Sequence, residues 1–162
     1  GEFTDEEKRK IRHHYAASVL QIDYEVGQIL QTLRDNELLD NTVILFASDH
    51  GDYLGDHNLI GKSSFYESST HVPLIVRPPD GVQPEVYPDV VGLGDVTATM
   101  LAYGRCDVPD WMDSVPLPKL GLAKDQQRDL FFGMVGSGWM AFDGRWKLCK
   151  YATGEHLLFD LD

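Results

Sequence analysis

The sequence predicts an α/β fold, in which helices flank part of a mixed sheet and a small antiparallel sheet with a helix follows toward the C-terminal end. Three patterns predict it: a long amphipathic helix, a continuous apolar run that is typical of a buried strand, and short alternating runs separated by turn residues after residue 130. Layered α/β domains combine these elements, because the apolar face of each must be covered by another.

The first element is a long helix. Thr4 and Glu7 have the spacing of a capping box, in which each side chain accepts a hydrogen bond from the backbone of the other residue. Apolar residues then recur every three or four positions and form one stripe: Ile11, Tyr15, Val19, Ile22, Val26, Ile29 and Leu33. We expect this stripe to pack against another part of the protein.

Strands and a shorter helix follow the long helix. The apolar, β-branched run 42–47 predicts a strand buried on both faces of a parallel or mixed sheet. The run 72–76, which ends before two prolines, predicts a second strand. Residues 95–101 predict a helix that ends at Gly104. The hairpin series at the end has its expected strands at 131–135, 139–142, 146–151 and 157–159.

The composition restricts the function. The chain has 162 residues, 26 acidic and 14 basic side chains, and a formal net charge of -12. This excess argues against proteins that bind nucleic acids or anionic membranes, because both need a basic face. Two cysteines are too few for a disulfide scaffold. No apolar run approaches the length of a membrane span, about 20 residues.

The densest polar segment, residues 48–57, directly follows the first predicted strand. Ligands of open α/β sheets bind beyond the carboxyl ends of strands. Asp49 and His50 are candidate ligands of a divalent cation, and an oxygen-rich site favours Ca²⁺, Mg²⁺ or Mn²⁺. Lys62 is a candidate contact for a sulfate or phosphate oxygen. An ordinary turn remains the alternative at this point.

The spacing of residues in the sequence excludes three other kinds of site. A phosphate-binding loop ending at Gly61 and Lys62 would need glycine at position 56, which is Asp56. Neither Ser63 nor Ser137 lies in the Gly-x-Ser-x-Gly frame of a hydrolase elbow. The acidic residues of the segment do not follow the alternation of an EF-hand loop.

Several blocks in order resemble the second metal-site segment of sulfatases, a family in the alkaline phosphatase superfamily. These blocks are Ser48-Asp49-His50-Gly51-Asp52, Leu54-Gly55-Asp56-His57, Gly61-Lys62, Phe65-Tyr66-Glu67 and Val72-Pro73-Leu74-Ile75-Val76. The preceding helix, the helix at residues 95–101 and the final strands also resemble this family. The resemblance implies an alkaline phosphatase/sulfatase-like sheet. It further implies a catalytic-domain portion at 1–104 and a small antiparallel-sheet subdomain at 105–162.

The resemblance also implies roles for particular residues. Asp49 and His50 match two ligands of a divalent cation, with Ca²⁺ first and Mg²⁺ or Mn²⁺ as alternatives. Lys62 matches the lysine that contacts the sulfate ester, which makes it the expected catalytic and substrate-binding residue. His57 is a second expected substrate-binding residue, and a loop histidine held by hydrogen bonds is the alternative. Histidine at position 50 is also similar to phosphonate and phosphodiester hydrolases.

One feature of the family is missing. Sulfatases make a formylglycine nucleophile from a Cys/Ser-x-Pro/Ala-x-Arg motif, and neither Cys106 nor Cys149 lies in one. We therefore expect a C-terminal fragment of a sulfatase-like hydrolase that is inactive alone, with a phosphonate or phosphate diester hydrolase or a non-catalytic fragment as alternatives. The expected partner is a small sulfate ester or a sulfated glycan, and an incomplete sheet is expected to favour self-association.

Overall fold

The computed structural model describes residues 1–79, 81, 83–122 and 128–162. The chain forms two compact units, Gly1–Val82 and Gln83–Asp162. In order, the elements are α1 (Asp5–Asp35), η1 (Leu39–Asn41), β1 (Ile44–Ala47), η2 (Asp56–Asn58), α2 (Glu67–Thr70), β2 (Leu74–Arg77), α3 (Leu93–Tyr103), β3 (Phe131–Val135), β4 (Gly138–Phe142), β5 (Trp146–Lys150) and β6 (His156–Asp160). The predicted α/β class is confirmed, whereas the domain boundary at residue 104 stays a prediction.

Helix α1 begins at the predicted capping box. The amide of Thr4 donates to the carboxylate of Glu7 at 2.8 Å, and the amide of Glu7 donates to the hydroxyl of Thr4. These bonds use two of the free amide groups that every helix start exposes. The hydrogen bonds with Thr4 also hold the pKa of Glu7 below its ordinary value. The local sequence alone therefore sets where this helix starts.

Most of the apolar stripe of α1 is exposed and only Ile11, Val26 and Leu33 are half-buried, so the expectation that the stripe packs is wrong for most of it among the described residues. Val19, Ile22 and Ile29 are 49%, 54% and 61% exposed, and no residue of α1 is buried. The helix is held near its ends, by η1 on one side and on the other by hydrogen bonds from Arg12 to Leu54 and to Asp56, the first residue of η2. Contacts at the ends leave the middle of the stripe open to water.

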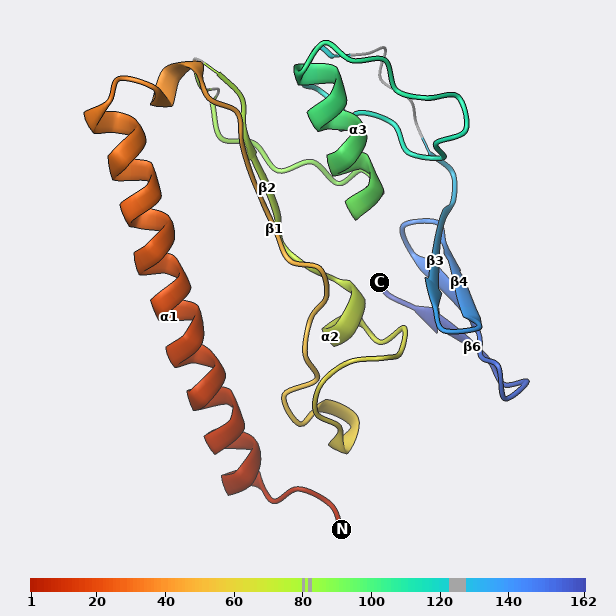
Figure 1. Cartoon of the computed structure of the whole chain (residues 1–162). Helices are drawn as coiled ribbons and strands as arrows, with labels where there is room; N and C mark the ends of the chain where they lie inside the picture. The colour runs from red at the N-terminus through yellow and green to blue at the C-terminus, as the bar shows by residue number, and fades with distance from the viewer. Residues whose placement is uncertain (80, 82, 123–127) are drawn as a thin grey trace. The chain divides into compact units, whose positions relative to one another are not determined.

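Strands β1 and β2 form a two-stranded antiparallel sheet, in which Ile44 pairs with Arg77 and Ala47 with Leu74. The predicted burial of the first strand on both faces is wrong, because Phe46 is 36% exposed. Within the described residues β1 pairs with β2 alone, so its other edge has no strand partner there. The chain reverses direction at η1, and β1 therefore runs back toward the level of the start of α1 (Figure 1).

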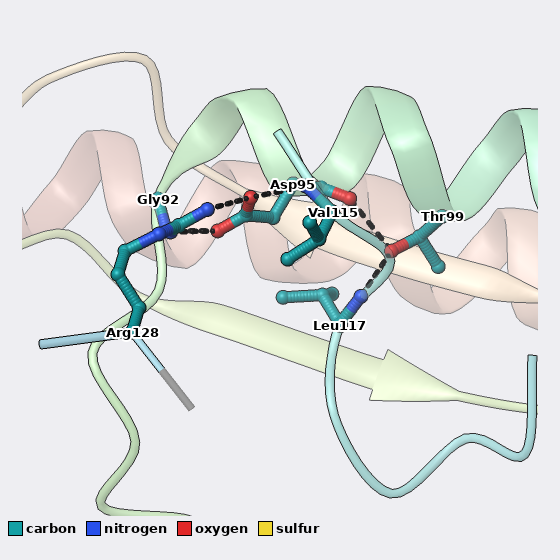
Figure 2. Close-up of polar contacts among 6 residues, drawn as sticks. All are labelled: Gly92, Asp95, Thr99, Val115, Leu117 and Arg128. Atoms are coloured by element: carbon teal, nitrogen blue, oxygen red, sulfur yellow. Dashed lines mark hydrogen bonds and ion pairs between the residues drawn. The ribbon is translucent and has the colours of Figure 1, made fainter. Parts of the chain in front are cut away.

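In the second unit, α3 confirms the predicted helix and a buried carboxylate ties it to later residues. Asp95 accepts two hydrogen bonds from Arg128, at 2.7 and 2.8 Å, and others from the amides of Gly92 and Val115 (Figure 2). The hydroxyl of Thr99 also accepts a hydrogen bond from the amide of Leu117. Burial raises the pKa of Asp95, but the hydrogen bonds that its carboxylate accepts from Arg128, Gly92 and Val115 outweigh this effect. They hold the pKa of Asp95 below its ordinary value.

The four-stranded sheet confirms the predicted hairpin series. Its strands are antiparallel and neighbours in the order β3, β4, β5, β6. Alternate residues of β4 and β5 are buried, including Met140, Lys147 and Cys149. At the turn between these strands the Asp143 carboxylate accepts from the amides of Arg145 and Trp146. Among the described residues, no helix has the length and apolarity that crossing a membrane requires.

Candidate functional site

The polar segment after β1 is held in place by the short helix α2. The amide of Gly51 donates to the carbonyl of Ser69 at 2.8 Å. A Cβ atom at position 51 would lie 2.0 Å from the carbonyl oxygen of Ser68. The backbone of residue 51 therefore approaches α2 more closely than any other residue type allows. This approach fixes the neighbouring Asp49 and His50 relative to α2.

Asp49 and His50 present a carboxylate and a ring nitrogen side by side. Nε2 of His50 lies 3.2 Å from Oδ2 of Asp49, and Nδ1 of His50 lies 2.8 Å from the carbonyl oxygen of Gly51. A carbonyl only accepts hydrogen bonds, so Nδ1 carries a proton and donates to Gly51, while Nε2 faces the Asp49 carboxylate. The Asp49 side chain is 82% exposed, which leaves its oxygens accessible.

Lys62 joins these two residues from the other end of a loop. Its Nζ atom contacts Nε2 of His50, twelve positions earlier in the sequence. The contact brings the ammonium group to the same ring nitrogen that lies beside the Asp49 carboxylate. Three of the residues predicted from the sequence, Asp49, His50 and Lys62, thus lie together and place a carboxylate, an imidazole and an ammonium group at one point.

His57 lies elsewhere in the loop. Its ring stacks on the ring of Tyr66, with centroids 3.9 Å apart and planes 15° apart, and its backbone is left-handed with φ of 52°. The side chain is exposed. The structure places His57 against Tyr66 rather than with His50, and its role in substrate binding stays a prediction.

Sequence reasoning assigned no role to Arg12 and Tyr66, although both hold the loop. Arg12 donates from Nε to the carbonyl of Leu54 at 3.1 Å and from a terminal nitrogen to Asp56 at 2.8 Å. Arg12 lies on α1, far from the loop in sequence, and Tyr66 stacks on His57 from an irregular segment. Contacts of this kind leave no periodic signal in the sequence.

A divalent cation would find a partial ligand set at this point. Asp49 supplies carboxylate oxygens and His50 an imidazole nitrogen, which Lys62 contacts in this structure, and such donors suit a cation of the Ca²⁺, Mg²⁺ or Mn²⁺ type. No group of three or more His, Cys, Asp or Glu residues that could hold a metal ion is found among the residues that the structure describes. The present residues therefore fit as part of a cation site that needs further ligands.

Comparison with known proteins gives the family. The family model named Sulfatase matches residues 1–104. The chain belongs to the sulfatase family. Among curated sulfatases, it is 34% identical to arylsulfatase K of Gallus gallus, covering 99% of the chain and 33% of that protein. It is 32% identical to the choline-sulfatase of Rhizobium meliloti (strain 1021), covering 98% of the chain and 32% of that protein.

Solved structures show the same fold. A putative sulfatase from Bacteroides fragilis has a TM-score of 0.83 at 26% identity, covering 99% of this sulfatase chain and 38% of that one. The phosphonate monoester hydrolase of Agrobacterium radiobacter has a TM-score of 0.81 at 28% identity, covering 98% and 36%. A protein solved with its substrate D-glucosamine-2-N,6-O-disulfate has a TM-score of 0.74 at 23% identity, covering 90% and 33%. The chain thus spans about a third of the length of the curated relatives it matches.

Proposed function

We propose that this chain carries one part of the active site of a hydrolase that cleaves sulfate esters. The observation that supports it is the meeting of Lys62 with His50 beside Asp49. Asp49 and His50 would hold a divalent cation, most favourably Ca²⁺, with Mg²⁺ or Mn²⁺ as alternatives. When bound, such a cation supplies Lewis-acid polarisation of an ester oxygen. The formylglycine nucleophile of this proposal lies outside the 162 residues, which contain no motif for it.

Lys62 has the clearest chemical task in this proposal. Its ammonium group would bind a sulfate oxygen and offset negative charge on the transferring group, which stabilises the transition state more than the ground state. Its contact with Nε2 of His50 supports this role, because a sulfate held by Lys62 would then lie next to the proposed cation ligands. The solved neighbour with D-glucosamine-2-N,6-O-disulfate supports a sulfated sugar as one substrate class, beside small sulfate esters.

A phosphonate or phosphate diester hydrolase is the second candidate. Histidine at position 50 and the 28% identity to a phosphonate monoester hydrolase favour it. A longer protein that contains this chain and its nucleophile separates the two by kcat/KM for an aryl sulfate against a phosphonate monoester. A preference of tenfold or more for the phosphonate would overturn the sulfatase assignment. The chain by itself should hydrolyse neither compound. Measurable turnover by it would contradict the proposal that the nucleophile lies outside these residues.

Calorimetry on the chain tests the ligand roles directly. We expect Ca²⁺ to bind weakly, with a dissociation constant of about 10⁻³ M, because two protein ligands rarely hold a hard cation tightly. Asp49→Ala should weaken this binding at least tenfold, and Lys62→Met should weaken the binding of inorganic sulfate in the presence of Ca²⁺. Asp40→Ala is the matched control, since Asp40 pairs with Arg77 away from the site. Equal Ca²⁺ affinities of the Asp49 and Asp40 variants would favour a non-catalytic fragment.

The exposed residues of the α1 stripe, and the edge of β1 that has no strand partner among the described residues, lead us to propose self-association. We expect the mass measured by light scattering to rise with protein concentration, because apolar groups at these positions are removed from water in an oligomer. Ile22→Lys with Ile29→Lys should return the chain toward a monomer. Gln31→Lys adds charge on the other side of α1 and serves as the control. A wild-type monomer at every concentration would reject the proposal.

A further inference from the structure

The side chain of Asp52 helps to close the base of the loop between His50 and Lys62. Its Oδ1 atom accepts hydrogen bonds from the amide of Leu54 at 2.9 Å and from the amide of Gly61 at 3.2 Å. The amide of Tyr53 also donates to the carbonyl of Gly61 at 2.9 Å. Asp52 and Tyr53, near the start of the loop, are therefore joined directly to Gly61 at its end, and Lys62 is the next residue after this junction.

The loop needs such a tie because its backbone is strained. Leu54, His57 and Asn58 have φ angles of 50°, 52° and 60°, in the left-handed region that residues with a Cβ rarely adopt. Each such residue costs of the order of a kilocalorie per mole and persists only where surrounding contacts enforce it. Arg12 holds the outer end of the loop through Leu54 and Asp56. Asp52 holds the inner end.

We propose that Asp52 is a positioning residue of the candidate site: by joining the two ends of the loop it brings Lys62 into contact with His50. The inference rests on the function proposed above. Asp52 acts as a hydrogen-bond acceptor for backbone amides and takes no part as a cation ligand. Without the Asp52 carboxylate the end of the loop keeps the backbone hydrogen bond from Tyr53 to Gly61 but loses the one from Gly61 to Asp52, and Lys62 can then move away from Asp49 and His50. Correct placement of a binding group before the ligand arrives is itself a large source of affinity and rate.

The substitution Asp52→Asn separates this role from that of a ligand. Asparagine keeps an oxygen that accepts both amide bonds but loses the negative charge. Asp52→Ala removes both the accepting oxygen and the negative charge. We expect Asp52→Asn to retain the loop, the contact of Lys62 and the wild-type Ca²⁺ affinity, and Asp52→Ala to lose the contact. Asp56→Ala, which removes another carboxylate of the same loop but leaves its base intact, is the matched control.

Two measurements give the result. The first is the nuclear Overhauser effect between the ε-methylene protons of Lys62 and the Hε1 proton of His50, which we expect in wild type, Asp52→Asn and Asp56→Ala and not in Asp52→Ala. The second is calorimetry with Ca²⁺ and with inorganic sulfate in the presence of Ca²⁺. Asp52→Ala should lower sulfate affinity about tenfold while Ca²⁺ affinity changes less than twofold. Adding Lys62→Met to Asp52→Ala should then cause no further loss of sulfate affinity, because Asp52 acts on sulfate binding only through Lys62.

The outcomes that overturn the proposal are distinct from those that overturn the proposed function. If Asp52→Ala keeps the contact and the sulfate affinity, or Asp52→Asn loses Ca²⁺ binding, Asp52 is not a positioning residue. If wild type binds neither Ca²⁺ nor sulfate, the proposed function fails, and the nuclear Overhauser effect still decides whether Asp52 places Lys62. Where Asp52→Ala does not fold, Asp52→Glu replaces it, since the longer side chain shifts the oxygen that both amides share; a contact retained there would count against the proposal.

Discussion

Replacing Arg128 with methionine is expected to lower the free energy of unfolding by about 3–5 kcal/mol, the largest effect we predict for this chain. The side chain of Asp95 is 3% exposed and that of Arg128 is 19% exposed, and they share two hydrogen bonds. Methionine preserves much of the packing but leaves the buried carboxylate without its cation. Urea denaturation followed by circular dichroism measures the change.

Arg145→Met is the control for this prediction. Arg145 also forms a two-bonded ion pair, with Asp160, but half of its side chain is exposed to solvent. Exposed ion pairs contribute little, because water solvates the separated charges almost as well. The Arg145 variant should thus lose far less stability than the Arg128 variant. Equal losses would show that burial of the Asp95 pair is not what stabilises the second unit.

The same pair predicts a pH dependence. Because the hydrogen bonds from Arg128, Gly92 and Val115 hold the pKa of Asp95 below its ordinary value, folding favours the ionised carboxylate. This stabilisation is fully present above the unfolded pKa of about 3.9 and is lost as the pH falls through the lower folded pKa. Asp95→Asn should remove that part of the acid dependence of the unfolding free energy, and a variant with the unchanged wild-type dependence would contradict the assignment.

Gly51→Ala is the second substitution with a large expected effect. The added Cβ would lie 2.0 Å from the carbonyl oxygen of Ser68, which is a backbone atom and cannot rotate away. We expect a loss of about 3 kcal/mol in unfolding free energy, at the upper end of overpacking costs. Since Asp49 and His50 precede this residue, the shift should also weaken Ca²⁺ binding in the calorimetric experiment above.

Gly27→Ala provides a matched control for Gly51→Ala. Gly27 lies within α1, where an added Cβ meets nothing within 4 Å. Alanine there should leave Ca²⁺ binding unchanged and stabilise the helix slightly, because glycine in a helix interior costs about 0.5–1 kcal/mol relative to alanine. If both variants behaved alike, the close approach of residue 51 to α2 would not be what fixes the site.

The elements of this chain could be predicted because their signals are local. The capping box of Thr4 and Glu7 sets the start of α1, and turn residues between alternating runs set the four strands of the second unit. The position of Asp49 and His50 just beyond a strand also follows from the sequence. The predictions that failed concern what covers an element, namely the stripe of α1 and the faces of β1, because burial depends on neighbours far away in the chain.

The sequence by itself determined the elements, the family resemblance and the identity of three residues that meet. The tertiary structure alone decided how they meet. Lys62 reaches His50 because Asp52 joins both ends of a strained loop, and that loop rests on Arg12 of a helix distant in sequence. His57 stacks on Tyr66, another contact between residues that are not neighbours in the sequence. Hydrogen bonds and ring contacts between distant residues have no period along the chain, so only folding in three dimensions brings them together.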